Sequence, residues 1–145
     1  MTANENMRLM KMLDDAWNSQ DWITFRKLHT KNVAVYWPGQ SKPTIGLDIH
    51  EKEAQILFNA FPDNHIDNVP YLVLFGQADW TCSIANFTGT HTAPMIGENG
   101  TTIPPTNKKF HIELCTVAHW KKGKINEEKL FYDLIELMRQ LGWIQ

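Results

Sequence analysis

The chain of 145 residues is 43% hydrophobic and 11% aromatic, which suits one compact domain over residues 1–145 and is too short for two ordinary domains. Its 14 basic and 16 acidic residues give a formal net charge of -2, so the charge balance indicates neither nucleic acid nor an anionic membrane surface as a partner. The first residues, Met1–Asn6, have neither a basic stretch nor an apolar core, so we expect no leader, and the sequence contains no apolar run of membrane-spanning length. We therefore expect a cytoplasmic protein without membrane contact.

Helical signals come first along the chain. Hydrophobic residues at helical spacing predict a first helix from Met7 to Trp17, and Asp21 is a typical N-cap for a short second helix that reaches Leu28. The run Val33–Trp37 predicts a short strand, and the spacing from Ile49 to Phe61 predicts a third helix.

Strand signals dominate the second half. Alternating β-branched and aromatic residues predict four long strands at 65–77, 80–91, 109–120 and 125–133, before a last helical stripe from Leu134 to Leu141. This order favours an α+β fold in which helices cover one face of a curved sheet. The irregular segment Ala93–Asn107 is either a flap over a site or a mobile connection.

Two titratable side chains lie in the last two predicted strands. His119 precedes a Lys-Lys-Gly turn and Asp133 ends the strand after it, so a hairpin gives the two side chains a chance to meet. A histidine beside a carboxylate with a raised pKa can transfer protons near neutral pH. Two structural alternatives remain: Asp133 can cap the helix that starts at Leu134, and His119 can be an ordinary strand histidine beside Trp120.

Strand alternation places further polar residues on the face of His119. His111, Glu113, Cys115 and Val117 share this face, so they line the same wall if His119 faces a pocket. His111, Glu113 and His119 also make a weak candidate for a two-histidine, one-carboxylate iron or zinc site, and we expect no metal there. The two cysteines, both in probable strands, are expected to be buried free thiols.

Five sequence blocks in the C-terminal two thirds carry a resemblance to a known family. They are Gly89–Thr92, Ile103–Thr106 leading into Phe110, His119–Ile125, Tyr132–Asp133 and Gln140–Gly142. In order and spacing, these blocks resemble those of the SnoaL-like polyketide cyclases. The resemblance implies the cone-shaped α+β fold of the nuclear transport factor 2 superfamily, in which a strongly curved, mostly antiparallel sheet and the N-terminal helices enclose a central pocket.

The resemblance also implies an activity. Characterised members close the last ring of an aromatic polyketide by intramolecular aldol condensation, without metal or organic cofactor. The family's acid/base aspartate falls on Asp133 and its pocket histidine on His119. We therefore expect a cofactor-independent cyclase or lyase for a hydrophobic, polyoxygenated small molecule. The other side chains expected to contact the substrate are Trp17, Trp37, His65, Asn86, His111 and Cys115, of which Asn86 lies on the strand where many relatives place an arginine.

Two other functions fit the same residues. Dehydration or double-bond isomerisation uses similar proton transfer in related pockets, and a non-enzymatic ligand-binding or interaction module would keep the pocket without the chemistry. Six tryptophans fit a large apolar pocket or a hydrophobic subunit interface, and the outer face of the predicted sheet favours a homodimer.

Overall fold

The computed structural model describes residues 1–97 and 99–145, and position 98 of the predicted flap lies outside them. Within these residues the helices are α1 (Ala3–Ser19), α2 (Trp22–Lys27), α3 (Leu47–Ala60) and α4 (Leu134–Gln140). Thr2 and Glu5 form a capping box at the start of α1, and the Asp21 side chain accepts a hydrogen bond from the Thr24 amide at the start of α2. These helices lie where the hydrophobic spacing predicted them.

The strands pack into one main sheet and one small ribbon. The strands of the described residues are β1 (His29–Tyr36), β2 (Thr44–Ile45), β3 (His65–Asp67), β4 (Val73–Gln77), β5 (Trp80–Thr90), β6 (Met95–Ile96), β7 (Thr102–Ile103), β8 (Lys109–Lys121) and β9 (Lys124–Phe131). The main sheet has the order β2-β1-β9-β8-β5-β3, with β4 also paired to β5, whereas β6 and β7 pair with each other. Only β1 and β9 run parallel among these described pairs, so the predicted antiparallel-dominated α+β fold is confirmed.

The predicted strand at 65–77 is wrong in one respect. It consists of two strands, β3 and β4, which both pair with β5 at different positions along its length. Pro70 lies between them and has no amide N–H for a sheet hydrogen bond, so a continuous ladder is interrupted there.

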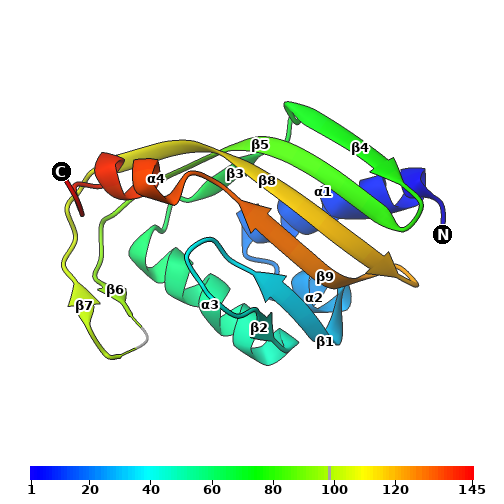
Figure 1. Ribbon diagram of the computed structural model, residues 1–145, viewed down its shortest axis with the longest axis horizontal. Helices are drawn as coiled ribbons and strands as arrows, with labels where there is room; N and C mark the ends of the chain where they lie inside the picture. The colour runs from blue at the N-terminus through cyan, green and yellow to red at the C-terminus, as the bar shows by residue number, and fades with distance from the viewer. Residues whose placement is uncertain (98) are drawn as a thin grey trace.

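Helices α1, α2 and α3 cover one face of the curved sheet, and the main core lies between the two layers (Figure 1). On β8, the inner face carries the buried side chains Phe110, Ile112, Leu114, Thr116, Ala118 and Trp120. The odd-numbered side chains of β8 therefore point to the outer face, because successive strand residues alternate. Among the described residues, no helix is both long enough and apolar enough to cross a bilayer.

One irregularity in β9 decides which of its side chains face inward. Successive residues of β8 pair with Glu127 and Ile125, so Asn126 is an extra residue in β9. Such a β-bulge shifts the inward and outward alternation by one position. Ile125 and Glu128 are consequently both buried, although an unbroken alternation would turn them to opposite faces.

Candidate active site

A cavity of about 50 Å³ lies between the helical layer and the inner face of the sheet. Most of its lining is aromatic or aliphatic, and its acidic and imidazole side chains are Asp14, His29, His50 and Glu128. A cavity of this size holds a few water molecules or the reactive end of a small molecule. An apolar pocket with a few convergent polar groups is the usual form of a small-molecule site.

The cavity adjoins a wider groove at the molecular surface. Trp37, Leu57 and Tyr132 line both the cavity and this groove, which has a volume of about 270 Å³. Met95 and Ile96 of β6 form part of the far wall. The segment that the sequence predicted as a flap or a mobile connection therefore borders the outer part of the site.

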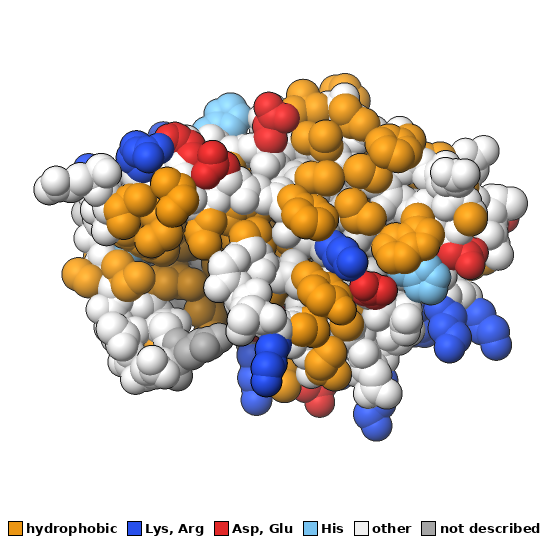
Figure 2. All heavy atoms as spheres, in the orientation of Figure 1, with side chains coloured by type: hydrophobic (Ala, Val, Ile, Leu, Met, Phe, Trp, Pro, Cys, Tyr) orange, Lys and Arg blue, Asp and Glu red, His pale blue; other side chains and the backbone are white. Residues whose placement is uncertain are grey.

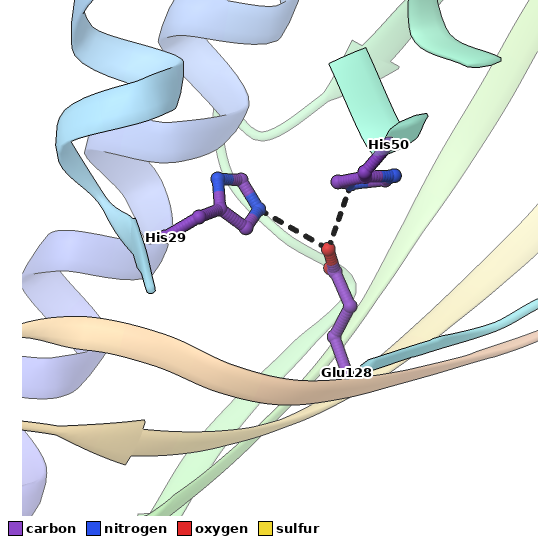
Figure 3. Close-up of side chains that lie close together, drawn as sticks. All are labelled: His29, His50 and Glu128. Carbon is purple, nitrogen blue, oxygen red and sulfur yellow. Dashed lines mark hydrogen bonds and ion pairs between the residues drawn. The ribbon is translucent and has the colours of Figure 1, made fainter. Parts of the chain in front are cut away.

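The floor of the cavity contains two histidines that meet one carboxylate oxygen (Figure 3). The Nε2 atoms of His29 and His50 lie 3.2 and 3.0 Å from Oε1 of Glu128. All three side chains are buried, with exposed fractions of 0, 4 and 7%. We call His29, His50 and Glu128 the buried cluster.

Each member of the buried cluster is positioned by a different element. His29 begins β1 directly after α2, and its Nδ1 lies 2.6 Å from the carbonyl oxygen of Phe25 in the last turn of that helix. His50 lies in the first turn of α3 on the buried stripe of that helix. Glu128 faces inward because of the bulge at Asn126.

In the buried cluster, hydrogen bonds and neighbouring charges shift the pKa values in the direction opposite to burial. Burial alone would raise the pKa of Glu128, but the hydrogen bonds from His29 and His50 together lower this pKa well below its usual range. Burial would also lower the pKa of His50, and its contacts with Glu128 and Glu53 reverse this and raise the pKa. Glu128 is therefore a carboxylate at neutral pH and a weak base.

A second carboxylate supports His50 from the other side. Oε1 of Glu53 lies 3.5 Å from Nδ1 of His50 and accepts a hydrogen bond of 3.0 Å from Nε1 of Trp37. Its other oxygen accepts a hydrogen bond of 2.7 Å from the Thr44 hydroxyl. Although burial favours the protonated form of Glu53, the bonds from His50, Thr44 and Trp37 lower its pKa.

Asp14 is the cavity carboxyl whose pKa is raised rather than lowered. It lies on α1, is half-buried, and accepts a hydrogen bond of 2.5 Å from the Tyr71 hydroxyl. Burial raises the pKa of Asp14 to about 7; the Tyr71 bond opposes this, and the negative charge of Glu128 adds to it. Asp14 can therefore gain or lose a proton near neutral pH.

The structure does not bring His119 and Asp133 together. His119 is on the outer face of β8, where its ring packs against that of Trp80 in a tilted arrangement with centroids 4.8 Å apart. The β8–β9 pairing ends at Phe131, and Asp133 follows two residues later, roughly 20 Å along the strand direction from His119. The expected meeting of the two groups in a pocket is therefore wrong, because β8 turns its even-numbered side chains inward.

Asp133 instead takes the structural role that the sequence left open. It is exposed and caps α4, with its Oδ1 accepting a hydrogen bond of 2.9 Å from the Glu136 amide. It does not line the cavity. Nothing in this geometry supports an acid/base role.

The six predicted substrate-contacting residues divide into two groups. Trp17 and Trp37 line the cavity. The other four, His65, Asn86, His111 and Cys115, do not line it. They are exposed or partly exposed on the outer part of the sheet, where Nε2 of His111 lies 3.0 Å from the Asn86 amide oxygen. The corresponding prediction of a polar pocket wall on that face of β8 is wrong for the same reason as for His119.

The thiols and the weak metal candidate also lie on this outer face. Sγ of Cys115 is 3.8 Å from Sγ of Cys82, and both cysteines are free and partly exposed rather than buried. His111 and Glu113 are exposed, so they do not form the inward metal site that strand spacing allowed. Among the described residues, the cluster with metal-ligating geometry is His29, His50 and Glu128.

Sequence reasoning missed the side chains of the cavity floor. His50 occupies a helical position on the stripe of Leu47 and Ala54, so its spacing marks it as inward-facing. Asp14 and His29 have no such local signal, and Glu128 would point outward without the bulge. Only the paired strands reveal that bulge.

The curved sheet, the covering helices and the enclosed cavity define a protein of the nuclear transport factor 2-like type. The profile of the SnoaL-like polyketide cyclase family matches residues 7–141. The chain therefore belongs to the SnoaL-like polyketide cyclase family, as its sequence blocks indicated. A comparison with curated protein sequences finds no match.

Solved structures share the fold at low sequence identity. A candidate SnoaL-like polyketide cyclase from Jannaschia sp. CCS1 has a TM-score of 0.84 and 20% identity, over 99% of this chain and 95% of that one. AclR, a candidate hydroxylase from Streptomyces galilaeus, has a TM-score of 0.81 and 19% identity, over 99% and 100%. IdmH, a candidate polyketide cyclase from Streptomyces antibioticus, has a TM-score of 0.77 and 22% identity, over 94% and 98%. At these identities the likeness shows the fold alone.

Proposed function

We propose that the chain is a cyclase-type lyase that moves a proton at carbon in a hydrophobic, oxygenated small molecule, with intramolecular aldol condensation as the reaction class. Asp14 is the general acid/base. The observation that carries this proposal is the Asp14 carboxyl on the wall of an apolar cavity, bonded to Tyr71 and with its pKa raised to about 7. Family membership supports the reaction class.

The chemistry requires one base of moderate strength. A carbon atom between two electron-withdrawing groups loses a proton to the Asp14 carboxylate, and the resulting enolate attacks a carbonyl carbon of the same molecule. The carboxylic acid of Asp14 then returns the proton to the alkoxide that forms, so the carboxyl ends unchanged. A pKa near 7 makes Asp14 a stronger base than an ordinary aspartate while much of it stays ionised at neutral pH.

The shape of the site restricts the substrate. The enclosed cavity of about 50 Å³ admits a reacting end but not a fused ring system. The rest of a larger substrate would occupy the adjoining groove beside Trp37 and Tyr132, whose volume is about 270 Å³. The buried cluster supplies polar contacts for substrate oxygens on the cavity wall.

A small carbon acid tests the role of Asp14. We expect the wild-type protein to accelerate exchange of the α-proton of ethyl 2-methylacetoacetate in D₂O, followed by proton NMR, and Asp14→Asn to lower this rate by at least about 100-fold. His119→Gln and Asp133→Asn are the matched controls and should retain the wild-type rate. A normal rate in Asp14→Asn together with a loss in Asp133→Asn would return the catalytic role to the originally predicted aspartate.

We also propose that the chain forms a homodimer through the outer face of its sheet. Hydrophobic side chains gather over β4, β5 and β8 on the face turned to the viewer in Figure 2. Phe75 and Trp80 belong to this surface and are 57 and 38% exposed, which is unusual for side chains of that size. An apolar patch of this kind is typical of a subunit interface.

A further inference from the structure

The hydrogen-bond partners of His29 require a proton or a cation between this histidine and Glu128. A backbone carbonyl can only accept, so Nδ1 of His29 carries the proton that it donates to Phe25. Its other ring nitrogen, Nε2, lies 3.2 Å from the Glu128 carboxylate oxygen, and when Nε2 has no proton its lone pair faces that oxygen. Two acceptors at this distance require a second proton or a cation between them.

The same carboxylate oxygen receives the second histidine. Nε2 of His50 lies 3.0 Å from Oε1 of Glu128, and the candidate ligand atoms of the buried cluster all lie within 4.8 Å of one another. Metal–nitrogen and metal–oxygen bonds of about 2.1 Å place adjacent ligands about 3.0 Å apart in an octahedral site and about 3.4 Å apart in a tetrahedral one. Both measured separations between nitrogen and oxygen, 3.0 and 3.2 Å, fall in this interval.

The partners outside the buried cluster match those of metal-binding histidines. A ligating histidine usually donates its other ring N–H to a carbonyl or a carboxylate, which holds the ring orientation. His29 has the Phe25 carbonyl at 2.6 Å, and Nδ1 of His50 lies 3.5 Å from the Glu53 carboxylate, an ion-pair contact that is longer than a well-formed hydrogen bond. The two negative charges of Glu53 and Glu128 also balance a divalent cation in an environment that penalises net charge.

We propose that Nε2 of His29, Nε2 of His50 and an oxygen of Glu128 bind a divalent first-row transition-metal ion such as Zn²⁺ or Fe²⁺. Two imidazoles and one carboxylate suit these ions and leave coordination positions open. The three residues line the cavity, so the open positions face the substrate space. A bound ion would supply Lewis-acid stabilisation of the enolate formed when Asp14 removes the proton; this role rests on the proposed function and departs from the metal-free chemistry that the family resemblance implies.

Metal binding is tested without reference to activity. The full chain, free of any histidine tag and treated with a chelator, is titrated with Zn²⁺ by calorimetry and with Co²⁺ by visible absorption. We expect one ion per chain, with affinity lowered at least about 100-fold in His50→Gln and Glu128→Gln. The surface control is His65→Gln combined with His111→Gln, which should bind normally because both histidines are exposed.

A milder variant covers the case in which the buried substitutions unfold the protein. Glu53→Gln leaves the three ligands in place and removes the negative charge of the carboxylate beside His50, a carboxylate that also accepts hydrogen bonds from Trp37 and Thr44. It should weaken binding by about 10-fold while circular dichroism stays unchanged. Absence of stoichiometric binding in the wild type, or equal affinity in Glu53→Gln and Glu128→Gln, would overturn the metal site. The buried cluster would then be an ion pair held together by protons on the histidines.

A second measurement separates the metal from the proposed reaction. One equivalent of Zn²⁺ should raise the α-proton exchange rate of ethyl 2-methylacetoacetate at least about 10-fold in the wild type. Asp14→Asn should bind Zn²⁺ normally and remain slow. Zinc binding without faster exchange overturns the enolate-stabilising role alone, whereas fast exchange in Asp14→Asn overturns the proposed function and leaves the metal site standing.

Discussion

Three carboxyl groups near the cavity behave differently because their neighbours differ. Glu128 and Glu53 accept hydrogen bonds from histidine, indole or hydroxyl donors, and these lower the pKa of both despite burial. Asp14 has one hydroxyl donor and is close enough to Glu128 for that charge to act on it, so burial dominates and its pKa rises. Groups whose pKa values are pushed apart in one site are natural candidates for distinct chemical roles.

Asp14→Asn should stabilise the protein while removing its activity. The pKa of Asp14 is raised from 3.8 to about 7 in the folded state, so the native protein binds the proton more tightly than the unfolded chain. The stability that this proton supplies is present below pH 4 and is lost as the pH rises through 7. The wild type loses this stability and Asp14→Asn does not. We therefore expect the difference in free energy of unfolding, Asp14→Asn minus wild type, to grow by about 2 to 4 kcal/mol from pH 4 to pH 8.

Urea denaturation at several pH values measures this difference. Tyr71→Phe is a useful companion because it removes the hydrogen bond to Asp14 without removing the carboxyl group. A pH-independent difference between Asp14→Asn and wild type would show that the carboxyl has an ordinary pKa, and it would weaken the case for Asp14 as the base.

Asp133 should contribute to stability and not to catalysis. Asn caps a helix as well as Asp does, so Asp133→Asn should leave stability and α-proton exchange close to wild type. Asp133→Ala removes the acceptor for the Glu136 amide and should cost about 1 kcal/mol in the free energy of unfolding, with exchange unchanged. A loss of exchange activity in the alanine variant beyond its loss of folded protein would contradict the cap assignment.

At the scale of elements, the long pairing of β5 with β8 forms the central part of the sheet behind the cavity. Gly89 pairs with Phe110 in this ladder, and a Cβ atom at Gly89 would lie 2.6 Å from the Phe110 ring. The glycine of the Gly89–Thr92 block is therefore required by packing, because the ring covers the space above it. Phe110 is itself buried among Phe61, Ile112 and Leu141.

Gly89→Ala should therefore destabilise the protein by about 1 to 3 kcal/mol through overpacking. Phe110→Leu opens space above position 89, so the alanine should cost less in the Phe110→Leu background than in the wild type. Chemical denaturation of the two single variants and the double variant yields this coupling. Equal costs in both backgrounds would mean that Phe110 is not the obstructing side chain.

The bulge in β9 sets which of its side chains reach the cavity. It places Glu128, Leu130 and Tyr132 on the cavity wall and leaves Glu127 on the outer face opposite His119. Regular alternation from Ile125 would have placed the other set inward. One additional residue thus determines which glutamate of the adjacent pair joins the buried cluster.

At the scale of the whole molecule, the outer sheet face should control oligomeric state. Phe75→Lys puts a charge in the hydrophobic surface over β4 and β5, so we expect sedimentation velocity to change from dimer to monomer. The matched control is Ile23→Lys, since Ile23 on α2 is 84% exposed away from this surface. A monomeric wild type, or dissociation by both substitutions, would contradict this interface.

Much of the architecture follows from local sequence features. The capping residue Asp21, the helical stripes and the alternating strands predicted the element order, because these patterns express backbone preferences over a few residues. The split of 65–77 into β3 and β4 was not predicted, since both halves have similar strand composition. Trp17 and Trp37 line the cavity, whereas sequence alone could not separate core from pocket wall for them, because the same aromatic side chains fill both.

The sequence by itself determined the family, the α+β order and the hydrophobic character of the interior, because each depends on the pattern of neighbouring residues. Only the tertiary structure decided which charged groups share the cavity. His29 and Glu128 meet although they are 99 positions apart, and the bulge at Asn126 sets the inward face of β9. Strand orientation likewise sent His119 outward, since a period of two defines two faces without saying which one is covered.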